Sequence, residues 1–233
     1  YRGFEDIFRG PEEFIRERQR VYLDLIGTRQ PVLDVGCGRG EFLDLLAEAG
    51  VEASGIDINE GMVAHCRKKG HEVELVDANA YLEAQPDDSF GAIFAAQVIE
   101  HMSYEALVRF FGLVRDRLAP GGVFIAETVN PHSIPALKAF WVDPTHRNPI
   151  FPEVAAALAR VHGFEDGLIV FPAGTGELDE DRVTQGEYAL VATKQGVGGG
   201  GARTRISAVG AEPASRARNS RIRRGEPRPR RAR

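Results

Sequence analysis

The sequence of 233 residues is poor in cysteine and tryptophan and has no long apolar run. Its longest apolar stretch, residues 90–99, is far shorter than the roughly 20 residues that a membrane-spanning helix needs. There is no charged and then apolar leader, and Cys37 and Cys66 form neither a CxxC pair nor a disulfide framework. We therefore expect a cytoplasmic chain without a transmembrane segment, in which both cysteines are packing residues.

Charge is divided unevenly along the chain. Residues 195–233 hold eleven arginines against two glutamates, a net charge of +9, which leaves the first 194 residues at −14. An acidic body is a poor surface for nucleic acid, because neutralisation of phosphates supplies most of the affinity of nucleic-acid-binding proteins. We expect no nucleic-acid partner, while peripheral contact with a membrane and the oligomeric state stay open.

The chain divides into three regions. Residues 1–29 mix apolar and charged side chains and are predicted to form one or two amphipathic helices that pack on the body. Residues 30–194 form the predicted main domain. Residues 195–233 contain almost no large apolar side chain, so we expect disorder there. The abrupt change of composition favours a frame-shifted or artificial extension over an arm that binds nucleic acid or anionic membrane.

Strand and helix patterns alternate through the main domain. Strand patterns occupy 31–35, 53–57, 72–76, 90–96, 122–128, 168–171 and 187–193, and the helix patterns include 40–49, 59–70, 103–118 and 152–161. Such alternation predicts an α/β fold with a doubly wound, mostly parallel sheet covered by helices on both faces. Ligands bind such sheets at the carboxyl ends of the strands.

Three glycines follow the first predicted strand in the stretch VLDVGCGRGEF, residues 32–42. A dinucleotide fingerprint reads GxGxxG, but Glu41 occupies the place of the third glycine, and no Lys-Ser/Thr pair follows as in a Walker loop. Carboxylates at Asp34 and Glu41 favour instead a cationic adenosine ligand without phosphate. Asp57 and Asp77 end the next two strands, within reach of ribose hydroxyls and of the adenine amino group; a tight turn and helix caps are the plain alternatives.

Four segments, VLDVGCGRGEF, SGIDIN, VDAN and FGAIFAAQVIEHM, together resemble the class I S-adenosylmethionine-dependent methyltransferases over residues 31–128. The resemblance implies a Rossmann-like sheet of seven strands with an antiparallel last strand, and S-adenosylmethionine as cofactor. The cofactor-binding positions that it implies are Asp34, Gly36, Gly38, Gly40, Asp57, Ile58, Asp77, Ala78 and Gln97.

Methyl transfer requires alignment of two reactants, and a base where the acceptor must lose a proton. Histidine suits that role at neutral pH, and we predict His146 and His101 as the catalytic residues. A surface or capping role stays open for His146 and is favoured for His132. The long segment VDPTHRNPIFPE, residues 142–153, is typical of a binding loop. The predicted acceptor-binding residues are Arg147 in this segment and Trp141 directly before it, although Trp141 also suits a core position.

Two weaker resemblances concern metal binding and the methyl acceptor. QVIEH, residues 97–101, resembles the EVIEH segment of ubiquinone-pathway O-methyltransferases, whose acidic residues and histidine have been linked to a divalent metal. Gln97 replaces the first acid, and hard cations bind several anionic oxygens, so we expect no metal.

A second resemblance concerns the acceptor. The segments FEDIFRGPEEFIRERQRVYLDLI and DPTHRNPIFPE resemble methyltransferases encoded with bacterial surface-polysaccharide glycosyltransferases. A sugar hydroxyl or a sugar-linked phosphate is therefore the preferred acceptor.

The expected function is methyl transfer from S-adenosylmethionine to an oxygen of a small molecule or glycan. A catalytically silent module that binds the cofactor or a partner is the main alternative. A nucleotide-dependent oxidoreductase on the same fold is a further one, but the missing third glycine and Glu41 argue against it.

Overall fold

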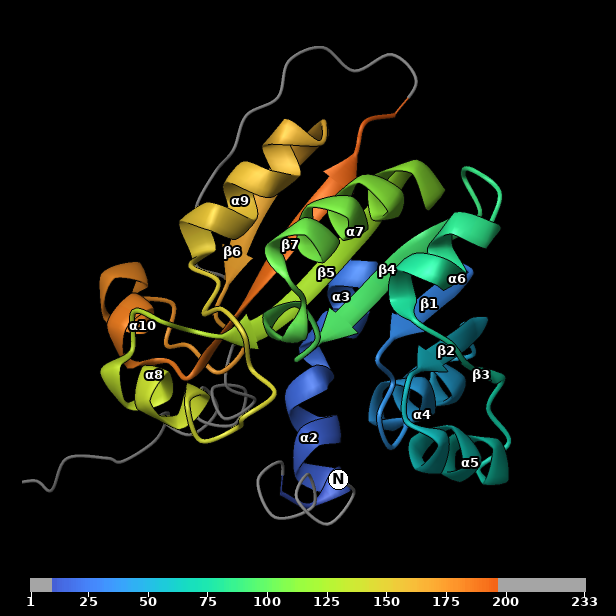
Figure 1. Ribbon diagram of the computed structural model, residues 1–233, viewed down its shortest axis with the longest axis horizontal. Helices are drawn as coiled ribbons and strands as arrows, with labels where there is room; N and C mark the ends of the chain where they lie inside the picture. Colours follow the sequence, from blue (N-terminus) through green and yellow to red (C-terminus); the bar gives the residue numbers. More distant parts are fainter. Residues whose placement is uncertain (1–9, 197–233) are drawn as a thin grey trace, which may run out of the picture.

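Seven strands form a single sheet in the order β3-β2-β1-β4-β5-β7-β6. The structure, a computed structural model, describes residues 10–196 (Figure 1). The strands are β1 Val32–Val35, β2 Ala53–Asp57, β3 Val73–Leu75, β4 Phe90–Ala96, β5 Leu118–Val129, β6 Phe164–Val170 and β7 Glu187–Lys194. Neighbouring strands pair in parallel except that β7 is antiparallel to both β5 and β6. The Rossmann-like sheet with its antiparallel last strand is thus confirmed.

Helices cover both faces of this sheet (Figure 1). They are α2 Glu12–Gln19, α3 Val21–Ile26, α4 Glu41–Glu48, α5 Glu60–Lys68, α6 Ala78–Ala84, α7 Tyr104–Arg117, α8 Ile134–Phe140, α9 Pro152–Val161 and α10 Leu178–Thr184, with the short 3-10 helix η1 Ile99–His101. Side chains of α6, α7 and α9 share one apolar core with the sheet, and those of α3 and α4 share another. No helix of residues 10–196 is long and apolar enough to span a bilayer.

In the described part of residues 1–29, helices α2 and α3 lie against the body (Figure 1). Tyr22 and Ile26 of α3 are almost fully buried. The Tyr22 ring lies 5.1 Å from that of Phe94 in β4 and 6.5 Å from that of Phe42 in α4. Residues 1–9 and 197–233, which include nearly all of the predicted disordered tail, lie outside the described residues.

The sequence pattern misses two short helices, α8 and α10, at the carboxyl edge of the sheet. Tertiary contacts hold them: the Asn130 side chain donates hydrogen bonds to the carbonyls of Arg182 and Gln185, both 2.9 Å long. Strand β5 also begins at Leu118, before the predicted start at residue 122. Its pairing with β4 is irregular at this end, where Gly121 has φ 79°.

Gly91 of β4 leaves no room for a side chain. A Cβ atom there would lie 2.4 Å from the amide nitrogen and 2.7 Å from the carbonyl oxygen of Gln30, and backbone atoms cannot rotate away as a side chain would. We expect Gly91→Ala to lower the free energy of unfolding by about 1–3 kcal/mol in urea denaturation. Gly186→Ala meets no atom within 4 Å and is the control, expected within about 0.5 kcal/mol of the wild type.

Candidate cofactor and active site

The glycine loop between β1 and α4 has the backbone that a close-lying ligand needs. Gly36, Gly38 and Gly40 have φ angles of 67°, 54° and 81°, a left-handed region that favours glycine. A Cβ atom on Gly36 would lie 2.5 Å from Cγ2 of Val98, which follows β4. The loop can therefore carry no side chain at its closest approach to the end of β4.

Asp57 fastens this loop to the carboxyl end of β2. Its Oδ2 accepts a 2.9 Å hydrogen bond from the Gly38 amide, and its Oδ1 accepts one of 2.7 Å from the Asn59 amide. A carboxylate oxygen accepts more than one hydrogen bond, so both oxygens can also accept bonds from ribose hydroxyls. Next to it, the Ile58 side chain is 76 % exposed. An exposed apolar surface beside a carboxylate fits an adenosine ligand.

Asp77 and Ala78 lie at the start of α6, after β3. The Asp77 side chain caps this helix, with Oδ1 accepting bonds of 2.9 and 3.1 Å from the amides of Asn79 and Ala80. The capping alternative is therefore correct for Asp77. Since both bonds go to Oδ1, the cap is compatible with a contact from Oδ2 to an adenine amino group.

Glu41 does not offer its carboxylate to a ligand, contrary to the reasoning from sequence. It is 2 % exposed, and its Oε1 accepts a 2.7 Å bond from Nε of Arg39, which is itself buried. A second nitrogen of Arg39 donates to the Gly10 carbonyl at 3.0 Å. A charge buried this deeply requires a partner, and Arg39 is that partner. Asp34 of β1, the other predicted acid, is similarly buried, with 3 % of it exposed.

Gln97 lies at the end of β4 in a left-handed conformation, with φ 58°. Its amide donates a 2.9 Å bond to the Glu127 carbonyl, and its side-chain Nε2 donates to Glu127 Oε1 at 3.3 Å. The predicted cofactor-binding residues thus come from the ends of β1, β2, β3 and β4, which lie at one edge of the sheet because these strands are parallel.

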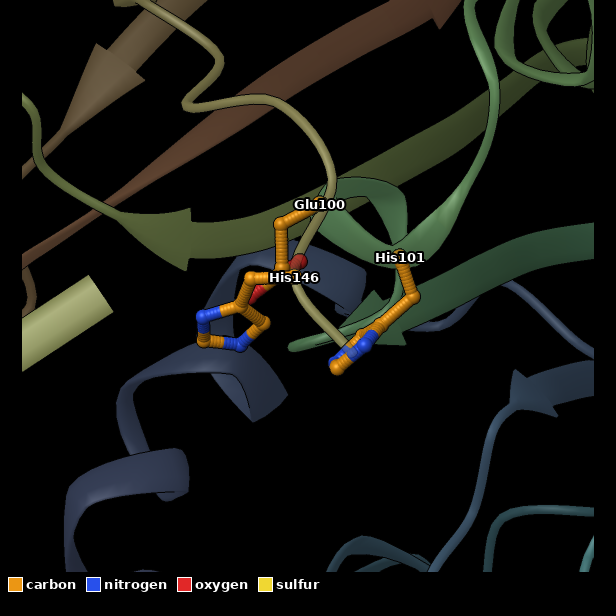
Figure 2. Close-up of side chains that lie close together, drawn as sticks. All are labelled: Glu100, His101 and His146. Carbon is orange, nitrogen blue, oxygen red and sulfur yellow. The ribbon is translucent and has the colours of Figure 1, made fainter. Parts of the chain in front are cut away.

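His101 and His146 lie together beyond the end of β4, although 45 positions separate them in the sequence. Their ring centroids are 4.7 Å apart, and His146 also packs on the Phe140 ring at 4.4 Å. Figure 2 shows both imidazoles near the carboxylate of Glu100. His132, in contrast, lies near Glu153, 3.0 Å from its Oε2, and Arg182 pairs with the same carboxylate. A structural role for His132 fits these contacts.

Hydrogen bonds determine which nitrogen of each ring carries the proton. His146 Nδ1 lies 2.6 Å from the Phe140 carbonyl, which only accepts, so this nitrogen donates. The Thr145 hydroxyl donates to Asp143 at 2.6 Å and therefore accepts from Nδ1 of His101 at 3.0 Å. In both neutral rings Nε2 then carries the lone pair, as a proton acceptor requires.

Asp143 and Thr145 are parts of the site that the sequence reasoning missed. Asp143-Pro144 suggests only a turn, although an Asp followed two positions later by Thr is a known side-chain turn signal. Burial opposes the charge of Asp143, but the hydrogen bonds from Thr145 and the nearby His146 and His101 hold the pKa of its carboxyl below the usual value. An ionised Asp143 accepts the hydrogen bond from the Thr145 hydroxyl, so this hydroxyl can only accept from His101. The tautomer of His101 with its proton on Nδ1 is thereby fixed.

The predicted acceptor-binding residues are on the surface of the same loop. Trp141 is 61 % exposed and meets Phe140 edge-on at 5.0 Å, so the core alternative for Trp141 is wrong. Arg147 is exposed, and its amide donates a 2.9 Å bond to the Glu100 carbonyl. That bond holds the loop against η1, close to the two histidines.

Within residues 10–196, one group of side chains has the spacing of a metal site: Glu100, His101 and His146, whose ligand atoms lie within 4.8 Å of one another. Glu100 is fully buried, and the two histidines are partly buried. The group offers one carboxylate, whereas hard cations such as Mg²⁺ and Ca²⁺ bind several oxygens. Two histidines and one carboxylate are instead a ligand set that zinc accepts.

Comparison with known proteins identifies the class. Residues 32–122 match the methyltransferase domain family. A solved S-adenosylmethionine-dependent methyltransferase from Archaeoglobus fulgidus superposes with a TM-score of 0.75 at 31 % identity, over 82 % of this chain and 98 % of that one. The chain therefore belongs to the S-adenosylmethionine-dependent methyltransferase family.

Curated relatives agree on the class. A "Probable S-adenosylmethionine-dependent methyltransferase" of Mycolicibacterium smegmatis is 34 % identical over 64 % of this chain and 58 % of its own length. A ubiquinone biosynthesis O-methyltransferase of Methylococcus capsulatus is 35 % identical over 52 % of this chain and 50 % of its own. The chain thus spans just over half the length of the first and half of the second.

The Thr145 hydroxyl should contribute to the lowered pKa of Asp143. We expect Thr145→Val to raise the pKa of Asp143 toward its ordinary value of 3.8, because one hydrogen bond to the carboxylate is lost. A carbon-detected NMR titration measures this shift, with Thr184→Val, whose hydroxyl bonds the Glu180 carbonyl, as control. Because the pKa is lowered in the folded state, the carboxylate stabilises the fold above about pH 4, and this contribution disappears as the pH falls through the lowered pKa. An unchanged pKa would contradict the assigned contact.

Proposed function

We propose that this protein transfers the methyl group of S-adenosylmethionine to an oxygen of a small molecule or glycan. The observation that carries the proposal is the pair His101 and His146, which have their rings 4.7 Å apart beyond the end of β4. Membership of the methyltransferase family supports the donor. The bare loop, the exposed Ile58 and the carboxylates at Asp34 and Asp57 fit that donor's adenosine and its positive charge.

When bound, S-adenosylmethionine supplies a methyl group on a positively charged sulfur, and the protein aligns the acceptor oxygen with it. His146 or His101 accepts the hydroxyl proton at Nε2 as the oxygen bonds to the methyl carbon. The Phe140 carbonyl and Thr145 hold the two rings in the tautomers that this requires. The acidic Asp34 and Asp57 favour the cationic donor over its neutral product, because losing the sulfonium charge weakens the attraction.

Arg147 and Trp141 are the proposed contacts for the acceptor. An exposed guanidinium suits a hydroxyl or a phosphate oxygen, and an exposed indole suits the flat face of a sugar ring. The resemblance to methyltransferases of surface-polysaccharide clusters makes a sugar hydroxyl or a sugar-linked phosphate the preferred acceptor. We propose a metal-free reaction: a single carboxylate at Glu100 disfavours a hard cation, and the two histidines are available as bases only when zinc, which this ligand set would accept, is absent.

Asp57→Ala should weaken binding of S-adenosylmethionine at least about tenfold, which corresponds to about 1.4 kcal/mol. The substitution removes two acceptor oxygens for ribose and frees the Gly38 amide that orders the loop. Isothermal titration calorimetry on the full chain measures the change. Asp87→Ala is the control, since Asp87 pairs with Arg117 before β4, at the other edge of the sheet. Absence of binding by the wild type at millimolar ligand would overturn the proposed donor, and binding of NADH instead would favour an oxidoreductase.

Substitution of either catalytic histidine should lower turnover and leave the affinity for the methyl donor unchanged. On an acceptor found by screening cofactor consumption with nucleotide sugars, glycans and quinol precursors, we expect His146→Ala or His101→Ala to lower kcat about 10²- to 10⁴-fold. His132→Ala is the matched control, because this histidine pairs with Glu153.

Equal turnover by all three histidine variants would refute the proposed bases. A loss of activity with EDTA that zinc restores would assign the histidines to a metal instead. Donor binding without turnover on any acceptor would favour a catalytically silent module.

A further inference from the structure

Glu127 is an acid at the end of an otherwise apolar row on β5. Val123 and Ile125 precede it on the same face of the sheet, and both are buried in the core beneath α3 and α4. Glu127 itself is 5 % exposed and pairs with Ala96, the last residue of β4. A carboxyl group in this place requires hydrogen bonds to balance its loss of water.

Two side chains from distant parts of the chain supply those bonds. Tyr22 of α3 donates its hydroxyl to Oε2 at 2.5 Å, and Gln97 donates Nε2 to Oε1 at 3.3 Å. Both oxygens accept, which is the pattern of an ionised carboxylate. Burial, and then the charge of Glu127, raises the pKa of Tyr22 well above 10, so this hydroxyl keeps its proton at neutral pH.

A cation lies near this buried acid as well. Arg18 of α2 forms an ion pair with Glu187 of β7, and it also attracts Glu127. Burial raises the pKa of Glu187, and the negative charge of Glu127 raises it further, as expected for two carboxylates that lie close together. The N-terminal helices thus contribute both the charge balance and one of the two side-chain hydrogen bonds of Glu127.

The same contacts determine how Gln97 lies. Its backbone is held at φ 58° by the 2.9 Å bond from its amide to the Glu127 carbonyl. A carboxylate accepts hydrogen bonds and donates none, so the side-chain amide must direct its nitrogen to Glu127 and its oxygen away. The amide oxygen of Gln97 is thereby offered to a ligand that donates hydrogen bonds or carries positive charge.

We propose that Glu127 is a positioning residue for the methyl donor: by holding Gln97, with Tyr22 as its second support, it orients the Gln97 amide oxygen toward bound S-adenosylmethionine. This inference rests on the proposed function, because it assigns a ligand to Gln97. It also makes the N-terminal helix α3 a part of the donor site, although none of its residues is among the predicted cofactor-binding positions.

The test is a double-mutant cycle on the full chain, with S-adenosylmethionine affinity measured by calorimetry. We expect Glu127→Ala and Gln97→Ala each to raise the dissociation constant roughly tenfold, and the double variant to be no weaker than either single one, because both break the same contact. Tyr22→Phe should weaken binding less, since it removes one support of Glu127. Glu52→Ala, which removes an exposed carboxylate before β2, is the control.

Glu127→Gln should restore most of the affinity. A glutamine oxygen accepts from Gln97, while its nitrogen donates to Tyr22, whose hydroxyl reverses. Thermal unfolding of each variant separates the two roles: a merely structural Glu127 would lower the melting temperature and leave the affinity of the folded protein unchanged. Additive losses in the cycle, or wild-type affinity in Glu127→Ala, would overturn the inference. Absence of binding by the wild type would instead refute the proposed donor.

Discussion

The hydrogen bond from the Gly38 amide to Asp57 is the contact on which the donor site depends. It joins the glycine loop after β1 to the end of β2 and requires the left-handed backbone of Gly38. The other oxygen of Asp57 accepts from the Asn59 amide, and Asn59 caps α5. One carboxylate therefore orders a loop, a strand end and a helix start in the ligand-free fold. Such preorganisation strengthens binding, because less conformational entropy is lost when the ligand arrives.

The buried charged residues around the glycine loop have two different roles. Arg39 and Glu41 bond to each other, and Arg39 also donates to the Gly10 carbonyl. These contacts hold the start of α4 against the segment before α2. A buried pair of this kind offers little net stability, since desolvation offsets the attraction. Asp34 and Asp57 are the other acids of the proposed donor site. We therefore assign the proposed attraction of a cation to the strand ends and not to the acid that replaces the third glycine.

The sequence predicts this half of the molecule well, because local rules decide it. Short buried runs and helix caps such as Asn59 give the first five strands and their helices to within a few residues, except for the start of β5. It fails where distant contacts decide. Helix α10 is held by Asn130, which is far away in the sequence and whose side chain donates to the carbonyls of Arg182 and Gln185. The pairing of His101 with His146, and of Tyr22 with Glu127, likewise exists only in the folded chain.

The same division separates the family match from the proposed acceptor contacts. The family match covers residues 32–122, which contain the glycine loop and the strand ends of the proposed donor site. It ends before α8 and the loop with Trp141 and His146, where the proposed acceptor contacts lie. The bonds that hold that loop use its backbone atoms, as from the Arg147 amide to the Glu100 carbonyl and from the Tyr188 hydroxyl of β7 to the Ile150 carbonyl. Its sequence can therefore change without disturbing the donor site, which is how one sheet serves many acceptors.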